Sequence, residues 1–189
     1  MKIYTKTGDT GKTSLGSTAR VSKSHLRIEC CGSFDELNAA IALFVDQAEF
    51  FSVKNEGVRW LSERCQHVQR DLFSLGAELS LATKDSVFSQ GKALGLLEQQ
   101  IDAMTSKLPP LKNFILPGGN ILNSQLHLAR TICRRAERRM ISLFEAEGWQ
   151  DGPLAYVNRL SDWLFTGARF VSFNLKAKEM IWQPTIDGN

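Results

Sequence analysis

Hydrophobic residues recur at helical spacing along most of the chain. Over residues 61–79 the apolar positions alternate steps of four and three, which is the seam of helices packed at a shallow angle. The positions are Leu61, Cys65, Val68, Leu72, Leu75 and Leu79. Similar patterns run along residues 122–143 and 154–175, with Gly148 and Pro153 between them as a stop and a start signal. These patterns predict three long helices that share one core.

Two further helices are expected in the remainder of the chain. Ser33 and Glu36 have the S-x-x-E spacing of a capping box, in which each side chain satisfies an amide at the helix start. We therefore expect a first helix over residues 34–51 and a shorter one over residues 91–108, ended by Pro109-Pro110. Five helices joined by short connections predict an all-α five-helix bundle.

The first 32 residues differ, because Gly, Thr, Ser and Lys replace the helical pattern. Glycines let backbone amides converge on an anion, hydroxyl groups add donors and lysine adds charge, so this composition suits a phosphate-binding loop. The stretch concerned is Thr5-Lys6-Thr7-Gly8-Asp9-Thr10-Gly11-Lys12-Thr13-Ser14. A P-loop is excluded by spacing, since its first glycine would fall at Lys6. A flexible N-terminal turn is the alternative that composition leaves open.

Composition places the chain among globular domains with a substantial core. Of its 189 residues, 43% are hydrophobic and 23% charged, which excludes a disordered tail or a fibrous protein. The net charge of +3 is too small to indicate a nucleic-acid binder by itself. Its location is more informative, because residues 127–139 hold five arginines and one glutamate. We expect a single domain over residues 1–189.

The arginines of residues 127–139 follow a helical spacing. Arg130, Arg134 and Arg138 are four residues apart, so they form one stripe beside the apolar seam. Glu137 stands three residues after Arg134 and can hold its guanidinium. Arginine presents a planar fork of donors that suits polyphosphate oxygens. A solvated face with intrahelical ion pairs is the alternative, but five arginines with one acid repel one another, so we favour a bound phosphate group.

The last predicted helix carries a polar side formed by Asn158, Asp162 and Arg169. If this helix is the antiparallel neighbour of the arginine helix, Asn158 points into the same cavity as Arg134 and Glu137. An ordinary hydrogen bond between two helices is the alternative, and the sequence does not separate the two.

Other catalytic and metal chemistries lack the residues they need. The four cysteines are scattered and form no C-x-x-C pair, and the Cys and His spacing fits no zinc site. No histidine follows a glutamate by three residues, as a di-iron bundle would require. His25, His67 and His127 have no evident partners for a nucleophilic triad, so we expect them to be structural. Scattered thiols and the lack of an apolar signal or membrane span predict a reducing compartment such as the cytoplasm.

Several separated motifs coincide with one family: the chain resembles the PduO-type corrinoid adenosyltransferases. These enzymes transfer the 5′-deoxyadenosyl group of ATP to the cobalt of cob(I)alamin, forming adenosylcobalamin and releasing triphosphate. In chain order, the matching stretches are Ile3 to Asp9 with Gly11, Gly32 with Asp35-Glu36-Leu37-Asn38, Phe114 to Gly119, Leu126-His127 with Arg130, Arg134 to Arg138, and Val157 to Asp162.

The resemblance implies a ferritin-like five-helix bundle that assembles as a homotrimer, with ATP and Mg²⁺ in clefts between subunits. The family's nucleotide-binding positions map onto Thr5, Lys6, Thr7, Gly8, Thr13, Ser14 and Lys23 in the N-terminal segment, and onto Arg134, Arg135, Ala136, Glu137, Arg138 and Asn158 in the helices. Residues 16–23 depart from the usual family pattern, which leaves the role of Lys23 the least defined.

The resemblance also implies which residues serve catalysis, namely Arg134, Glu137, Phe114, Asp35 and Arg130. Asp35 and Arg130 match a pair that links neighbouring subunits near the active site. Phe114 matches the aromatic residue that helps to exclude the lower axial ligand of the corrinoid. Since such a ligand makes cobalt harder to reduce, its exclusion would let the protein tune the chemistry of its substrate.

We therefore expect an ATP-binding segment over residues 1–32, a helical bundle over 33–178 and a C-terminal tail over 179–189. The expected partners are ATP, cob(I)alamin, Mg²⁺, further copies of the chain and a flavoprotein reductase that supplies electrons, with no nucleic acid or membrane. Two alternatives remain open: an ATP-sensing or corrinoid-carrier protein without turnover, and a nucleic-acid binder that uses the arginine helix.

Overall fold

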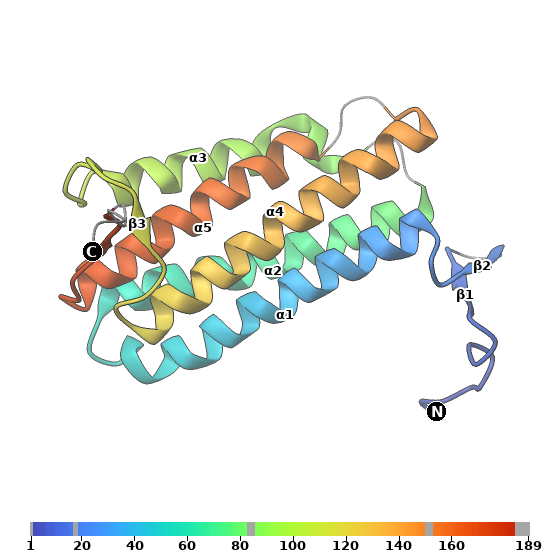
Figure 1. Cartoon of the computed structure of the whole chain (residues 1–189), viewed down its shortest axis with the longest axis horizontal. Coiled ribbons are helices and arrows are strands. Elements are labelled where there is room, and N and C mark those ends of the chain that lie inside the picture. The colour runs from blue at the N-terminus through green and yellow to red at the C-terminus, as the bar shows by residue number, and fades with distance from the viewer. Residues whose placement is uncertain (1, 17–18, 83–85, 150–152, 184–189) are drawn as a thin grey trace, which may run out of the picture.

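The computed structural model describes residues 2–16, 19–82, 86–149 and 153–183, and its main feature is a bundle of long helices (Figure 1). The helices are α1 (Leu26–Ser52), α2 (Glu56–Leu81), the short 3₁₀ helix η1 (Val87–Gln90), α3 (Lys92–Thr105), α4 (Ile121–Glu147) and α5 (Leu154–Asn174). Two small antiparallel ladders accompany them: β1 (Lys12–Leu15) with β2 (Ala19–Ser22), and β3 (Ile115–Leu116) with β4 (Met180–Ile181). The predicted all-α five-helix fold is confirmed. Within the described ranges, no helix is long and apolar enough to cross a membrane.

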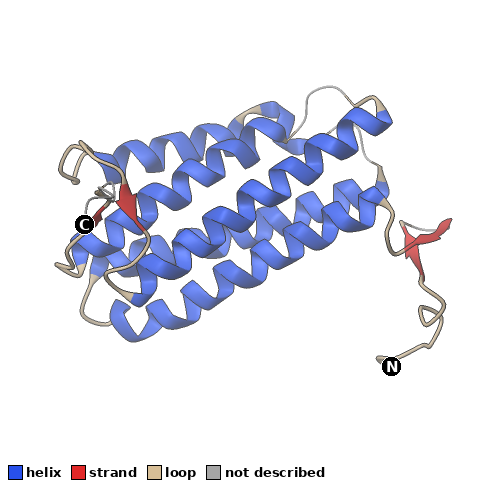
Figure 2. Ribbon diagram, viewed as in Figure 1, coloured by secondary structure: helices blue, strands red, loops and turns tan. Residues whose placement is uncertain are grey.

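Four helices, α1, α2, α4 and α5, enclose the core, and α3 packs on the outside against α5 (Figure 2). Helix α4 lies between α1 and α5, and α1 lies between α2 and α4. Arg27 near the start of α1 pairs with Glu147 at the end of α4, so these two helices are antiparallel. Helix α4 therefore buries one side against two neighbours and leaves the opposite side open.

The apolar seams predicted from spacing form this core. Every seam residue of α2 and α4 is buried, and so are those of α5 except Leu154 and Leu175 at its two ends. Gly148 ends α4 in the left-handed conformation, with a φ of 65°, as predicted for a stop signal. Pro153 immediately precedes α5 instead of occupying its first turn.

The predicted start of the first helix is wrong, because α1 begins at Leu26 instead of residue 34. Ser33 lies inside the helix, where its hydroxyl donates to the carbonyl oxygen of Glu29 at 2.9 Å and caps nothing. The cap is His25, whose Nδ1 accepts the Arg27 amide hydrogen at 3.2 Å. The expected division of the chain at residue 33 therefore falls inside α1, and the expected tail beginning at residue 179 contains β4.

The extra turns of α1 are held by Arg27, a buried arginine. Its guanidinium donates to the carbonyl oxygen of Leu79 at 2.7 Å and pairs with Glu147. The same group lies 5.1 Å from the ring centroid of Trp149. A buried charge is tolerated only when it is paired and hydrogen-bonded, and these contacts meet that requirement.

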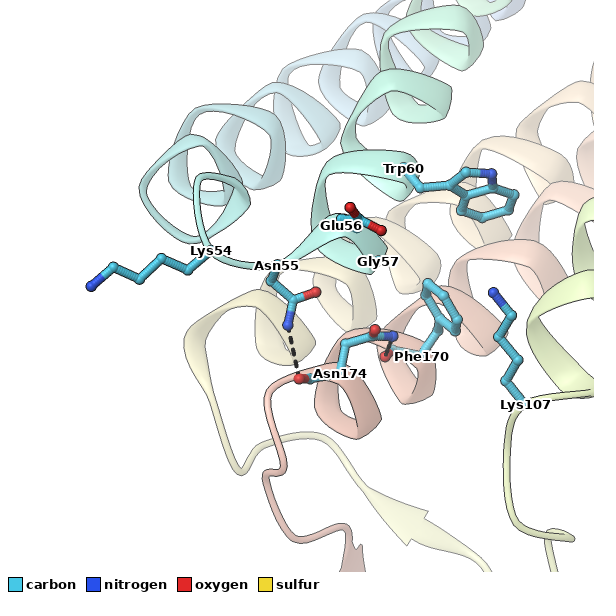
Figure 3. Close-up of a pocket in the computed structure, with 8 residues that line it drawn as sticks. All are labelled: Lys54, Asn55, Glu56, Gly57, Trp60, Lys107, Phe170 and Asn174. Atoms are coloured by element: carbon cyan, nitrogen blue, oxygen red, sulfur yellow. Dashed lines mark hydrogen bonds between the residues drawn. The ribbon is translucent and has the colours of Figure 1, made fainter.

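At the opposite end of the bundle, the start of α2 packs against the end of α5 (Figure 3). Asn55 caps α2 by accepting the Val58 amide hydrogen at 3.0 Å, and its own amide donates to the carbonyl oxygen of Asn174 at 2.8 Å. Gly57 lies so close to this junction that a Cβ atom there would stand 2.1 Å from Oδ1 of Asn174. Only glycine fits at this position without displacing Asn174.

Gly57→Ala is expected to be less stable than Gly95→Ala by about 1–2 kcal/mol, because the added methyl group displaces the Asn174 side chain and breaks its hydrogen bond to the Phe170 carbonyl oxygen. Gly95→Ala in α3 is the matched control, since a Cβ atom there meets nothing within 4 Å. It is expected to raise the free energy of unfolding by about 0.5–1 kcal/mol, the gain in helix propensity. Urea unfolding followed by circular dichroism measures both, and equal effects of the two substitutions would contradict the packing argument.

Candidate functional site

The N-terminal segment folds into a hairpin that gathers most of its predicted anion-binding residues. Strand β1 pairs with β2, and the guanidinium of Arg20 donates to the carbonyl oxygens of Thr7 and Lys12, at 3.1 Å for the latter. The hydroxyl groups of Thr5 and Thr7 lie 2.9 Å apart. The ammonium of Lys23 lies 3.5 Å from where a Cβ atom on Gly8 would stand. Lys23, the least defined candidate, is thus brought to the same loop as the others.

The backbone of this hairpin is suited to an anion. Lys6 has a φ of 59°, a left-handed conformation that is rare for a residue with a side chain, and Gly11 has a φ of 76°. In known anion-binding loops, left-handed residues beside right-handed ones turn neighbouring amides toward one concave surface, and the conformations of Lys6 and Gly11 allow such turns here. Thr13 and Ser14 follow on β1, where Ser14 is exposed and Thr13 half-buried.

The arginines of α4 separate into two sets. Arg135 forms an ion pair with Glu36 of α1, and Arg139 pairs with Glu29 at 3.3 Å. Arg134 and Arg138 lie on the open side of the helix, and no carboxylate of the described residues comes within 4.0 Å of either. The predicted stripe is thus the part of the cluster that the fold leaves unneutralised, whereas Arg135 points toward α1.

Asn158 contacts Glu137 across the two helices, which is the interhelical hydrogen bond that the sequence left open as the alternative to a ligand contact. Its amide donates to Oε1 of Glu137 at 2.8 Å, so α4 and α5 contribute to one polar surface. Among the described residues, Glu137 and Arg134 form no ion pair within 4.0 Å, and the backbone oxygen of Arg134 accepts a hydrogen bond of 3.1 Å from Arg138. Ala136 is fully buried, so its side chain faces the core and not this surface.

Of the other two polar residues of α5, Asp162 lies one turn after Asn158 on the same exposed face, whereas Arg169 lies elsewhere along the helix. Asp162 accepts a hydrogen bond of 2.9 Å from Arg159, which also reaches Glu98 of α3. Arg169 is buried and pairs with Glu179 beyond the end of α5. The prediction that these residues share one face of the helix is correct. Arg169, however, lies about 16 Å along the helix axis from Asn158 and contacts different partners.

Arg130, the first arginine of the stripe, is held by a buried histidine. Its Nε donates to Nδ1 of His127 at 3.2 Å, and the His127 ring packs edge-on against Phe165. Burial, with the neighbouring charge of Arg130, lowers the pKa of His127 from 6.5 to about 4. Burial and the charge of Arg134 lower the pKa of Arg130. His127 therefore stays neutral and accepts, while its buried Nε2 has no partner among the described residues.

Asp35 lies on another side of the bundle from Arg130. It is exposed on α1 and lines a groove of about 400 Å³ between α1 and α2, beside Asn38 and Phe73. Arg130 stands on α4 near α5. Within the described part of one chain, the two residues form no ion pair.

Phe114 belongs to an exposed aromatic pair, of which the sequence predicted Phe114 but not its partner Trp182. Its side chain is 80% exposed and meets Trp182 edge-on, with ring centroids 6.3 Å apart. Strands β3 and β4 pair directly beside it, and the Trp182 amide donates to the Phe114 carbonyl oxygen at 2.8 Å. The signal for Trp182 was the apolar run Met180-Ile181-Trp182 in the expected tail.

The hairpin and the arginine stripe lie far apart in one chain. The hairpin extends beyond the start of α1, where α4 ends (Figure 1). Arg134 is thirteen residues before the end of α4, so it stands about 20 Å along the helix from that end. The aromatic pair lies toward the other end of the bundle, where β3 is drawn (Figure 1). One chain thus presents three separate parts of a candidate site.

The pocket drawn in Figure 3 contains none of the predicted site residues. It has a volume of about 500 Å³ and lies between the start of α2 and the end of α5. Its lining residues are Lys54, Asn55, Glu56, Gly57, Trp60, Lys107, Phe170 and Asn174. Across the ranges that the structure describes, no group of three or more His, Cys, Asp and Glu side chains could hold a metal ion.

Comparison with known proteins gives a consistent result. A family model described as cobalamin adenosyltransferase matches residues 3–171. The chain is 42% identical over 174 residues to a corrinoid adenosyltransferase of Bacillus subtilis, covering 91% of this chain and 87% of that protein. It is 40% identical over 182 residues to a cobalamin adenosyltransferase of Cupriavidus metallidurans, covering 96% and 94%. Among solved structures, a variant PduO-type ATP:corrinoid adenosyltransferase from Lactobacillus reuteri complexed with cobalamin and ATP superposes with a TM-score of 0.83 at 32% identity, covering 97% of this chain and all of that one.

The buried neutral His127 is expected to make the protein less stable in mild acid. Its folded pKa of about 4 lies below the ordinary 6.5, so the unfolded chain binds the proton first and stability falls as the pH drops through 6.5 toward 4. Between pH 7 and pH 5 this amounts to about 2 kcal/mol.

His127→Asn, which keeps an acceptor near the position of Nδ1, is expected to remove that part of the pH dependence. Urea unfolding at pH 7 and pH 5 measures it, with the exposed His67→Asn as the matched control. An identical loss of stability at pH 5 in wild type and His127→Asn would show that His127 is not the group responsible.

Proposed function

The chain belongs to the cobalamin adenosyltransferase family, and we propose that it transfers the 5′-deoxyadenosyl group of ATP to the cobalt of cob(I)alamin, forming adenosylcobalamin and releasing triphosphate. One observation carries the nucleotide half of this function. Arg134 and Arg138 stand on the open side of α4 without a carboxylate within 4.0 Å in the described chain, although Arg135 and Arg139 beside them are paired. Such a face is stabilised by a bound polyanion.

The chemistry requires donors more than a protein nucleophile. Reduced cobalt attacks the ribose 5′ carbon of ATP, the carbon–oxygen bond to the triphosphate breaks, and negative charge develops on the leaving oxygens. Preorganised guanidinium groups from Arg134 and Arg138 stabilise that charge more than the ground state. Glu137, fixed by the 2.8 Å hydrogen bond from Asn158, accepts hydrogen bonds on the same surface.

The described residues fit a Mg²⁺ ion that arrives with the nucleotide. Mg²⁺ is commonly held by substrate phosphates, water and one or two carboxylates, and it does not need a cage of protein ligands. Glu137 is a carboxylate on the arginine surface, and Thr5 and Thr7 offer hydroxyl groups in the hairpin. When bound, the ion neutralises part of the charge on the triphosphate.

The exposed Phe114 is proposed to contact the corrinoid. Phe114 is 80% exposed and meets the exposed Trp182 edge-on, so the two rings form an apolar patch that a flat ring system can cover. Packed under the corrin ring, Phe114 excludes a lower axial ligand from cobalt, which makes cobalt easier to reduce. The Lactobacillus reuteri relative, which binds cobalamin and ATP together, supports a corrinoid site on this fold.

The nucleotide site is proposed to form between two copies of the chain. The hairpin residues Thr5, Lys6, Thr7, Gly8, Thr13, Ser14 and Lys23 cannot reach Arg134 of their own chain across about 20 Å of helix. Asp35 faces the groove beside α2, whereas Arg130 stands near α5. Pairing Asp35 of one copy with Arg130 of the next brings the hairpin of the first toward the stripe of the second. Closure of such a head-to-tail contact yields a ring, and the family resemblance implies that the ring is a homotrimer.

Exposed apolar residues on the surface formed by α1 and α4 support this assembly. Glu36 and Arg135 pair across the antiparallel helices α1 and α4. Seven residues make about two helical turns, so steps of seven from this pair toward the end of α1 give positions on the same face of both helices. These positions are at least half exposed: Leu43, Phe50, Ile121 and Leu128. The face lies between the Asp35 side and the Arg130 side, where a three-fold axis would pass. Subunit contact removes the apolar surface from water.

The remaining assignments follow the family. We propose that residues 1–189 act as one adenosyltransferase domain, that a flavoprotein reductase supplies the electrons, and that the protein works in the cytoplasm. Arg135 and Ala136 contribute through the backbone and packing of α4, because the Arg135 side chain is paired with Glu36 and that of Ala136 is buried.

The function is tested with the purified protein, ATP, Mg²⁺ and chemically reduced cobalamin. The expected result is a light-sensitive cobalt–carbon product together with free triphosphate, detected in parallel. Binding of both ligands without product would instead indicate a carrier or sensor. Affinity for nucleic acid that falls steeply with salt and is not competed by ATP would indicate the nucleic-acid alternative.

Arg134→Ala is expected to lower kcat/KM for ATP by about 10²–10³-fold, because it removes a donor to the leaving triphosphate. Arg139→Ala is the matched control on the same helix, since Arg139 is also exposed to solvent but is paired with Glu29. A surface ion pair of this kind contributes so little that the loss should stay below about fivefold. Similar losses in both variants would refute the distinction between paired and unpaired arginines.

Leu128→Asp is expected to dissociate the trimer and to abolish adenosyl transfer, because it buries a charge in the subunit contact. Leu96→Asp in α3 is the control, since both leucines are 50% exposed. Light scattering should give the 21.1 kDa monomer for the first variant and an unchanged mass for the second. A monomeric but fully active Leu128→Asp protein would overturn the shared site.

A further inference from the structure

Phe114 and Trp182 flank the two-stranded ladder of β3 and β4, which we call the platform. This ladder is too short to be stable without other contacts. Strands β3 and β4 have two residues each, and Leu116, Met180 and Ile181 are about half exposed. An isolated two-stranded ladder is marginal in water even when it is longer than this. Some other contact must therefore fix the two strands to the bundle.

Arg169 provides that contact from inside α5. Its Nε donates to Oε1 of Glu179 at 2.7 Å, and Nη2 lies 3.4 Å from Oε2, so the guanidinium engages both carboxylate oxygens. Nη2 also donates to the carbonyl oxygen of Pro109 at 2.9 Å. One buried side chain thus binds both segments of the platform, because Glu179 directly precedes β4 and Pro109 lies in the loop that leads to Phe114.

The two segments differ in how else they are anchored. The loop before α4 has a second tie, since the Gly118 amide donates to Oδ1 of Asn123 at 2.9 Å, and the Asn123 amide donates to the carbonyl oxygen of Ala168. The C-terminal segment crosses this loop closely: a Cβ atom on Gly119 would stand 2.8 Å from the carbonyl oxygen of Lys178. The two segments pack closely where they cross, but the ion pair of Arg169 and Glu179 is the charged contact that ties the C-terminal segment to α5.

The ion pair of Arg27 and Glu147 has a structural role alone, and it serves as a comparison for Arg169 and Glu179. Arg27 and Glu147 have side chains that are 7% and 24% exposed, against 7% and 27% for Arg169 and Glu179. Arg27–Glu147 joins two helix ends. Arg169–Glu179 joins a helix to the strand that carries Trp182, so the two pairs match in burial and differ in what they hold.

We propose that Arg169 is a positioning residue for the corrinoid reaction: through Glu179 and the Pro109 carbonyl it holds the Phe114–Trp182 pair where the pair can exclude the lower ligand of cobalt. This inference rests on the proposed function, because it assigns a supporting residue to the corrinoid half of the same site. Arg169 acts through the aromatic pair and does not itself touch the substrate.

The test begins with the free protein. Glu179→Gln keeps the size of the side chain and one acceptor but removes the charge, and it is expected to speed backbone hydrogen exchange in residues 177–183, including the Trp182 amide that bonds to Phe114. Glu147→Gln should leave exchange in that segment unchanged. Unaltered exchange in Glu179→Gln would overturn the proposal without any reference to activity.

The second readout is equilibrium binding of cob(II)alamin in the presence of ATP, followed by the absorption change that marks loss of the lower cobalt ligand. Glu179→Gln is expected to weaken binding by about tenfold, as loss of a supporting side chain behind a site does, and to diminish the absorption change. ATP affinity should be unchanged. Equal weakening by Glu147→Gln would show a general loss of stability and would overturn the proposal.

A double-mutant cycle with Trp182→Ala then separates positioning from additive damage. If Arg169 and Glu179 act through the aromatic pair, Glu179→Gln has a clearly smaller effect on cob(II)alamin binding once Trp182 is removed. Independent, additive losses would overturn the proposal. A wild-type protein that binds cob(II)alamin but forms no adenosylated product would refute the proposed function while leaving this cycle, which uses binding alone, fully interpretable.

Discussion

The simultaneous burial of α4 against α1 and α5 is the constraint on which the rest of the site depends. Successive residues of a helix turn by about 100°, so once Ala129, Cys133 and Ala136 occupy the core, the direction of every arginine on α4 is settled. Arg135 and Arg139 run along α1, which supplies the two carboxylates they need. Arg134 and Arg138 point to the open side, where no carboxylate of α1 reaches them. The same packing that stabilises the bundle therefore concentrates its unbalanced charge on one surface.

This division explains which parts of the site could be predicted from the sequence. The seams of α2, α4 and α5 follow from spacing alone, since burial repeats with the helical period. The contact of Asn158 with Glu137 needed only the added assumption that α4 and α5 are neighbours. The start of α1 could not be found in this way, because the contacts that hold its first turns come from Leu79 and Glu147, far along the chain. A local capping signal at Ser33 was the stronger pattern and was wrong.

The platform under Phe114 escaped prediction for a related reason. Helices α4 and α5 lie between its two strands in the sequence, and each strand is too short to show a strand period. Arg169 was placed correctly on a polar helical face, yet its partner Glu179 lies beyond the helix, in a segment expected to be a tail. Spacing within one helix identifies which side chains share a face. It does not identify the segment that crosses that face.

The distance between the N-terminal hairpin and the middle of α4 has a genetic consequence. When a nucleotide site takes its hairpin from one copy and its arginines from the next, a defect in either part damages a site without destroying the whole protein. A chain with a faulty hairpin still lends an intact α4, and a chain with a faulty α4 still lends an intact hairpin. In the proposed homotrimer, two different inactive alleles expressed together would give mixed assemblies in which some sites contain only intact parts, so each allele would complement the other where neither works alone.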